Sequence, residues 1–118
     1  MKTLIKNGKL ITASETFDSD ILIEDEKISR IGLGLEADSA KVVDASGKLI
    51  LPGGVDPHTH FDLPMFETVS SDDHYTGHKA AAFGGTTTVM DFASFDFDTM
   101  KESVDAWMKK AEKAAIDY

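Results

Sequence analysis

The feature that most constrains the fold is a change of sequence pattern at Pro52-Gly53-Gly54. Before this point, short apolar runs alternate with polar turn residues, which is typical of β-hairpins. After it, an apolar run is followed by a helix-compatible stretch, a β-branched run and a second helical stretch. Strands that alternate with helices form parallel sheets, because a parallel connection needs a crossover. The pattern therefore predicts a β-module over residues 1–50 and the start of an α/β fold over residues 51–118.

Turn residues divide the first segment into three expected hairpins. The turns are Asn7-Gly8, the polar stretch from Glu24 to Lys27, and Ser46-Gly47. Asn-Gly favours the positive φ angles of a tight two-residue turn. The run from Leu49 to Val55 has the continuous apolar character of a parallel strand that is covered on both faces.

Local signals place two helices and a strand in the second segment. Ser70 to Asp73 is a helix-start signal, and Gly84-Gly85 is expected to end a helix over His74 to Phe83. The β-branched run from Thr86 to Phe92 predicts the next strand. A capping box at Thr99 to Glu102 begins a second helix. Its expected buried stripe is Met100, Val104, Trp107, Met108, Ala111, Ala114 and Ala115.

Two histidines one residue apart, His58 and His60, follow the first apolar strand. Alternate side chains leave the same face of a strand, roughly 6.6–7 Å apart at the backbone, so both rings can reach one metal ion. The alternative is a pair of ordinary polar residues that are hydrogen-bonded to the backbone. Sites of α/β folds lie at the carboxyl ends of strands, which favours the metal interpretation. Asp56 and Asp62 share the same alternation face and are candidates to orient or join the site.

Three other features have competing interpretations. His74 and His78 stand one helical turn apart, which fits a metal pair, but a solvated helix face is the preferred interpretation. The apolar segment Leu63-Pro64-Met65-Phe66 is either a loop on the core or a wall of a substrate pocket. Asp91, near the end of the second strand, is either a structural cap, which we favour, or a carboxylate that supports the site.

Composition excludes several classes of function. The formal net charge of −9, without a basic patch, argues against nucleic-acid and anionic membrane partners. No cysteine is present, so any metal must be held by nitrogen and oxygen donors. The first residues are too polar for a signal peptide, and no apolar run approaches ~18 residues. These features predict a soluble, cytoplasmic protein.

Several ordered motifs together resemble the cyclic amidohydrolases, most closely their dihydropyrimidinase and D-hydantoinase branch. The motifs are Asn7-Gly8, Gly47-Lys48, Leu51 to Asp56, His58-Thr59-His60 and Ala80 to Thr88. The resemblance implies part of a small β-sandwich over residues 1–50. Residues 51–118 would then be the first two βα units of a TIM-barrel catalytic domain, which needs roughly 250 residues when complete. We therefore expect the chain to be an N-terminal piece of a larger protein that is inactive by itself.

The resemblance also implies a site and a reaction. His58 and His60 match two ligands of a two-metal, usually zinc, centre, whose remaining ligands lie later in the family's chains. Leu63 and Met65 match a segment that contributes apolar side chains near the substrate. The implied reaction is hydrolysis of a cyclic ureide or imide, in the family usually by a homotetramer. Asp62 stands where related dihydroorotases carry an arginine, which favours a neutral ring as substrate.

Other interpretations of the same pattern stay open. They are an allantoinase-like enzyme, a non-catalytic relative of dihydropyrimidinase that acts as a scaffold, and, less favoured, a stand-alone β-rich binding module.

Overall fold

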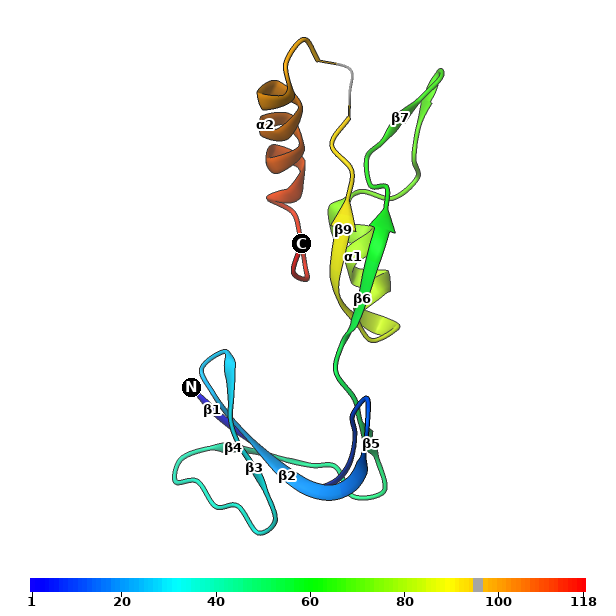
Figure 1. Cartoon of the computed structure of the whole chain (residues 1–118). Helices are drawn as coiled ribbons and strands as arrows, with labels where there is room; N and C mark the ends of the chain where they lie inside the picture. Colours follow the sequence, from blue (N-terminus) through cyan, green and yellow to red (C-terminus); the bar gives the residue numbers. More distant parts are fainter. Residues whose placement is uncertain (95–96) are drawn as a thin grey trace. The chain divides into compact units, whose positions relative to one another are not determined.

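A computed structural model describes residues 1–94 and 97–118 and divides into two compact units, Met1–Pro52 and Gly53–Tyr118 (Figure 1). The first unit consists of β-strands, and the second combines parallel strands with two helices. Within the described residues, neither helix has the length and apolar character that a membrane span requires.

The first unit is built on one five-stranded sheet with the order β3-β2-β1-β4, in which β5 also pairs with β1. Its core contains Leu4, Leu10, Ile21, Leu22 and Ala45. The strands are β1 (Lys2–Ile11), β2 (Thr16–Glu24), β3 (Lys27–Gly32), β4 (Lys41–Asp44) and β5 (Leu49–Ile50).

The hairpin expected at Asn7-Gly8 is wrong, because β1 continues through these residues. Asn7 does have a positive φ of 62°, but it lies in a register shift between Ile5 and Gly8 rather than in a chain reversal. Asp20 on β2 accepts a hydrogen bond from the backbone N–H of Asn7 at 2.8 Å. The positive φ therefore makes a bulge in β1, and the chain reverses after Ile11.

The other two turns differ in outcome. The hairpin over Glu24 to Lys27 is confirmed, since β2 and β3 pair antiparallel with Glu24 opposite Lys27. The hairpin expected at Ser46-Gly47 is wrong: β4 and β5 do not pair with each other, and both run parallel to β1. The conformation of the chain around Ser46-Gly47 is therefore determined by the pairing of β4 and β5 with β1.

The apolar run from Leu49 to Val55 does not form a single buried strand. Its first two residues are β5, and its last two begin β6 (Gly54–Thr59) in the second unit. β6 is exposed over most of its length because, among the described residues, it pairs only with β9 (Thr86–Asp91). The pairing is parallel, as expected from the alternation of strands and helices.

Helix α1 (His74–Phe83) joins these two strands and lies against one face of the pair (Figure 1). Its predicted start and end are confirmed. Asp73 is the N-cap and accepts hydrogen bonds from the N–H groups of Tyr75 and Thr76. Gly85 follows the helix with a φ of 88°, a conformation that glycine adopts without strain.

Helix α2 (Met100–Ala111) begins at the predicted capping box, but its buried stripe differs from the prediction. Ser103 and Ala111 are buried, whereas Met100, Val104 and Met108 are 80%, 49% and 47% exposed. The helix also ends at Ala111, before Ala114 and Ala115, which were assigned to its stripe. The described neighbours of α2 contact the face that carries Ser103 and Trp107, and this packing overrides the apolar pattern.

The last described residues continue the parallel sheet. Asp117 forms a parallel bridge with Thr88. The N–H of Val89 donates to the carbonyl of Asp117 at 3.0 Å, and the N–H of Asp117 donates to that of Thr87 at 3.1 Å. A strand-like segment thus lies beside β9 on the edge that β6 does not occupy.

Candidate functional site

The site begins at a β-bulge near the carboxyl end of β6. Asp56 pairs with Val89, and Thr59 pairs with Asp91, so three steps along β6 match two steps along β9. The extra residue lies in the stretch that contains Pro57, whose ring nitrogen has no hydrogen to donate to a neighbouring strand. A bulge bends its strand and re-aims the side chains around it.

His58 and His60 project from this end of β6, and their rings meet. Their Nε2 atoms lie 3.1 Å apart, and the ring planes are inclined at 79°. Two nitrogen ligands at 2.0–2.1 Å from one tetrahedral ion stand about 3.3 Å apart, so the pair fits two ligands of one metal. The described residues contain no group of three or more His, Cys, Asp or Glu side chains that could hold an ion. Within the described part of the chain, the two histidines thus have no third side chain of these types beside them.

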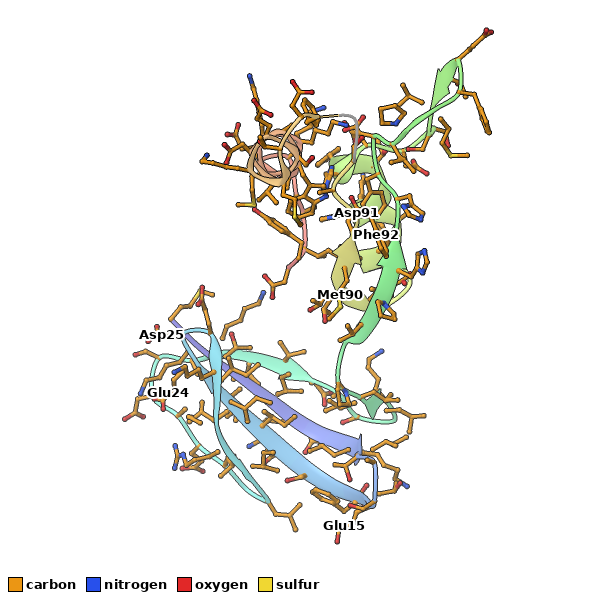
Figure 2. The ribbon with its side chains drawn as sticks, turned by 45° about the horizontal axis from the view of Figure 1, so that its top comes forward. Glu15, Glu24, Asp25, Met90, Asp91 and Phe92 are labelled. Carbon is orange, nitrogen blue, oxygen red and sulfur yellow. The ribbon has the colours of Figure 1, made fainter. Side chains whose placement is uncertain are left out.

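Phe92 contacts both imidazole rings, a role that the sequence did not suggest. Its ring centre is 4.8 Å from that of His58 and 5.2 Å from that of His60. Figure 2 shows Phe92 next to Asp91 at the end of β9, which is the strand that pairs with β6. The position of Phe92 at the end of the strand predicted over Thr86 to Phe92 was the only sequence signal for this contact.

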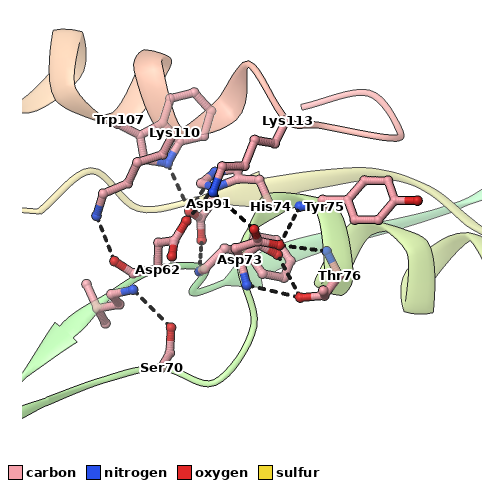
Figure 3. Close-up of polar contacts among 12 residues, drawn as sticks. Asp62, Ser70, Asp73, His74, Tyr75, Thr76, Asp91, Trp107, Lys110 and Lys113 are labelled. Atoms are coloured by element: carbon pink, nitrogen blue, oxygen red, sulfur yellow. Dashed lines mark hydrogen bonds and ion pairs between the residues drawn. The ribbon is translucent and has the colours of Figure 1, made fainter.

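The side chain of Asp91 is fully buried and accepts hydrogen bonds from several elements. Its Oδ1 accepts from the hydroxyl of Thr59 and from the backbone N–H of Phe61, both at 3.2 Å. Its Oδ2 accepts from the indole Nε1 of Trp107 at 2.8 Å and lies 3.5 Å from Nε2 of His74 (Figure 3). The sequence favoured a structural role, but as a cap of a following turn, and it did not indicate these partners.

His74 and His78 are not on a solvated helix face, and that prediction is wrong. Both are completely buried, because Phe61 packs on both rings and Trp107 packs on His74. Among the described residues, neither ring nitrogen of His74 has a hydrogen-bond partner. The Nδ1 of His78 accepts from the N–H groups of Ala115 and Ile116, at 3.3 and 3.5 Å.

Burial lowers the pKa of His74, and the nearby carboxylates of Asp91 and Asp62 only partly oppose this effect. Burial also lowers the pKa of His78. Both rings are therefore neutral at pH 7, and they form part of the aromatic packing between the helices.

The two aspartates that were expected near the histidine pair have different positions. Asp56 accepts a hydrogen bond from the backbone N–H of His58 at 3.1 Å, which orients the bulge. Asp62 has a φ of 49°, which breaks the strand alternation, and its carboxylate lies 4.0 Å from Nδ1 of His74. The carboxylate of Asp62 therefore faces the buried ring of His74. This contact does not support the expectation that Asp62 selects a neutral substrate.

The segment from Leu63 to Phe66 forms part of a β-hairpin rather than a loop on the core. Strands β7 (Pro64–Met65) and β8 (Thr68–Val69) pair antiparallel. Met65 is 48% exposed, and Phe66 at the turn is fully exposed with a φ of 53°. Leu63 instead lines a cavity of about 20 Å³ together with Phe61, Phe92 and Trp107. That volume holds about one water molecule.

Parallel strands that alternate with helices, with a histidine pair at the carboxyl end of the first strand, make the second unit a segment of an α/β protein. The chain is 48% identical to a D-hydantoinase of Geobacillus stearothermophilus over 100% of its own length and 26% of that protein. It is 46% identical to a dihydropyrimidinase of Dictyostelium discoideum over 98% of its length and 24% of that protein.

A solved structure shows the same similarity. The crystal structure of a dihydropyrimidinase from Brevibacillus agri matches 100% of this chain and 26% of its own, with a TM-score of 0.95 and 49% identity. No protein-family model matches the sequence. The chain is similar over its whole length to D-hydantoinases and dihydropyrimidinases, and it spans 26% of the length of the Geobacillus relative.

Proposed function

We propose that this chain supplies part of the active site of a metal-dependent enzyme that hydrolyses the ring amide of dihydropyrimidines or 5-substituted hydantoins to N-carbamoyl amino acids. The observation that carries the proposal is the 3.1 Å approach of the Nε2 atoms of His58 and His60 at the carboxyl end of β6. The names of the relatives, D-hydantoinase and dihydropyrimidinase, support this class of substrate. No observation favours the allantoinase or scaffold alternatives over it.

His58 and His60 would hold a divalent ion, which we propose to be zinc, through Nε2, and the remaining ligands would come from outside this chain. A bound ion of this kind supplies Lewis-acid activation of water and of the ring carbonyl. The backbone of β6, the bulge at Pro57 and the ring of Phe92 set the directions of the two imidazoles. These residues therefore position the ligands before an ion arrives, which reduces the ordering that binding requires.

We propose that residues 1–50 belong to a β-sandwich and that residues 51–118 are the first two βα units of a TIM barrel. Two observations support the barrel. The Asp117 segment bridges β9 on the edge away from β6, as a next parallel strand would. The other edge of β6 has no neighbour among the described residues, which leaves it free for a closing strand.

The β7–β8 hairpin is the candidate for substrate selection. It begins four residues after His60, and Met65 presents an exposed apolar side chain. We propose that Leu63 and Met65 lie near the ring substituent of the substrate. A homotetrameric assembly and a cytoplasmic location are further proposals that rest on the family resemblance.

The experiment uses the whole protein that carries this chain, purified from zinc-supplemented cells. Bound metal is measured by plasma mass spectrometry, and hydrolysis of dihydrouracil and phenylhydantoin by ultraviolet absorbance. We expect bound divalent metal and turnover in the wild type, and loss of both in H58A and H60A. The matched control is D18N, which removes an exposed charge on β2. A wild type without metal and turnover, or histidine variants that retain both, would contradict the proposal.

A further inference from the structure

We propose that Asp91 is a positioning residue for the histidine pair. Its carboxylate fixes the end of β6 so that the Nε2 atoms of His58 and His60 converge on one point. The inference rests on the proposed function, because the purpose of the convergence is to hold a metal ion. Asp91 does not touch the ion in this scheme and acts only through the backbone and side chains that it binds.

Oδ1 of Asp91 is bound by the residues on both sides of His60. Thr59 and Phe61 are the residues on either side of His60, and both donate to this oxygen at 3.2 Å. The hydroxyl oxygen of Thr59 also lies 3.1 Å from the carbonyl oxygen of Met90, so the carbonyl and the carboxylate share its single hydrogen. The chain on both sides of His60 is therefore tied to the end of β9.

The contacts of Oδ2 hold the carboxylate itself. Trp107 on α2 donates to it at 2.8 Å, and His74 on α1 lies 3.5 Å away. The Asp91 side chain has 0% exposure, so water does not compete for these contacts. One oxygen thus faces β6 and the other faces the helices. The carboxylate therefore links the end of β6 to both helices.

The bulge explains why such a tie is needed. Regular pairing of β6 with β9 is interrupted between Asp56 and Thr59, the stretch that contains His58. A disrupted ladder leaves the backbone there less constrained than in a regular strand. The side chain of Asp91 replaces the missing backbone constraint, and the adjacent Phe92 packs against both imidazoles.

The test compares zinc affinities in the whole protein by competition with a chromophoric chelator. D91N is expected to weaken zinc binding by about 10- to 100-fold, the usual effect of losing a residue that supports metal ligands. T59V removes one of the two donors to Oδ1, so it should also weaken zinc binding, but by a smaller factor than D91N. The control is D20N, the same change at a carboxylate that is 4% exposed and bound to backbone N–H groups of the first unit. It should leave zinc affinity unchanged.

A purely structural role predicts a different result. D91N would then lower the midpoint of thermal unfolding, but the folded variant would bind zinc as the wild type does, and this would overturn the inference. Folding is checked by circular dichroism and by the fluorescence of Trp107. If D91N does not fold, T59V decides the question: weaker binding supports the inference and wild-type affinity overturns it.

A second measurement needs no metal and separates this inference from the proposed function. In apo protein, NMR cross-peaks between the rings of His58, His60 and Phe92 report the convergence directly. Their loss in D91N or T59V supports positioning by Asp91, and their persistence in both overturns it. A wild type that shows these cross-peaks but binds no zinc would contradict the proposed function alone.

Discussion

The ring of Phe61 occupies the space that a side chain at Gly77 would need. A Cβ added to Gly77 would stand 2.2 Å from Cε1 of Phe61. The same ring lies 5.4 Å from the ring of His74 and 5.0 Å from that of His78, centre to centre. The segment that follows the histidine pair therefore packs on α1 through the one position of the helix that lacks a side chain.

This contact reverses the usual effect of replacing a helical glycine. Alanine is normally favoured over glycine in a helix by roughly 1 kcal/mol. Here G77A should instead lower the free energy of unfolding by about 1–3 kcal/mol, the cost of overpacking a filled core. Urea unfolding followed by the fluorescence of Trp107 measures the change.

The matched control for G77A is G32A, because a Cβ at Gly32 would meet only Leu35 at an ordinary 3.6 Å. F61A should make room for the new methyl group, so the loss from G77A should be smaller in the F61A background. Equal stability of G77A and the wild type would show that Phe61 moves aside freely.

The buried histidines predict that stability falls in mild acid. Burial lowers the pKa of His74 and His78 below the ordinary value of 6.5, so below that pH the unfolded chain binds protons that the folded chain does not. Their contribution is present above pH 6.5 and is lost as the pH falls toward the lower folded pKa values. Urea unfolding between pH 7 and 5 measures the slope.

Replacing both histidines by phenylalanine should flatten that slope, since the two groups that gain protons on unfolding are gone. Single variants should each remove part of the effect. An unchanged slope in the double variant would assign the acid sensitivity to other groups, such as carboxylates.

The N-cap of α1 predicts a second acid transition. The N–H of Thr76 and the ammonium of Lys113, 3.1 Å away, lower the pKa of Asp73 to about 2. Its contribution to stability is therefore present above the ordinary value of 3.8 and is lost as the pH falls through about 2. At pH 7 we expect stability to decrease from wild type to D73N to D73A, since asparagine keeps the cap but loses the charge.

The gap between the wild type and each variant should shrink as the pH approaches 2, where the wild-type carboxylate becomes protonated. Chemical unfolding at pH 7 and in acid measures both effects. A constant gap between wild type and D73A across this range would show that the charge of Asp73 contributes nothing.

Asp20 predicts a local effect in the first unit. Its carboxylate accepts from the N–H of Asn7 at 2.8 Å and from that of Leu35 at 3.0 Å, and the first contact does most to lower its pKa. D20A would leave two amide groups without their acceptor, so we expect faster hydrogen exchange at Asn7 and Leu35. D20N retains one oxygen and should be intermediate. Unchanged protection in D20A would mean that other acceptors replace the carboxylate.

The parts of the fold that could be predicted are those that local chemistry determines. Asp73 and Gly85 bound α1, and Thr99 and Glu102 start α2, because capping depends on residues within one turn. The turn at Asn7 was wrong because its positive φ serves a bulge, and only the partners of β1 on both sides reveal this.

The site could be predicted in part for the same reason. Alternation indicated that His58 and His60 leave one face, although the bulge at Pro57 was not visible in the sequence. The burial of His74 depends on Phe61 and Trp107, which are distant in sequence, so helical spacing alone could not show it. Polar residues whose partners lie on other elements are the ones that sequence patterns misplace.

The extra residue in β6 has a consequence for protein engineering. If a His-x-His pair were grafted onto a regular strand, the directions of its two rings would be set by the regular pleat of that strand alone. In this protein the pairing of β6 with β9 shifts by one residue between Asp56 and Thr59, the stretch that contains His58. Anyone transplanting this histidine pair would have to move Asp56, Pro57 and the Asp91 partner with it, because the approach of the two Nε2 atoms depends on the irregular strand around the motif.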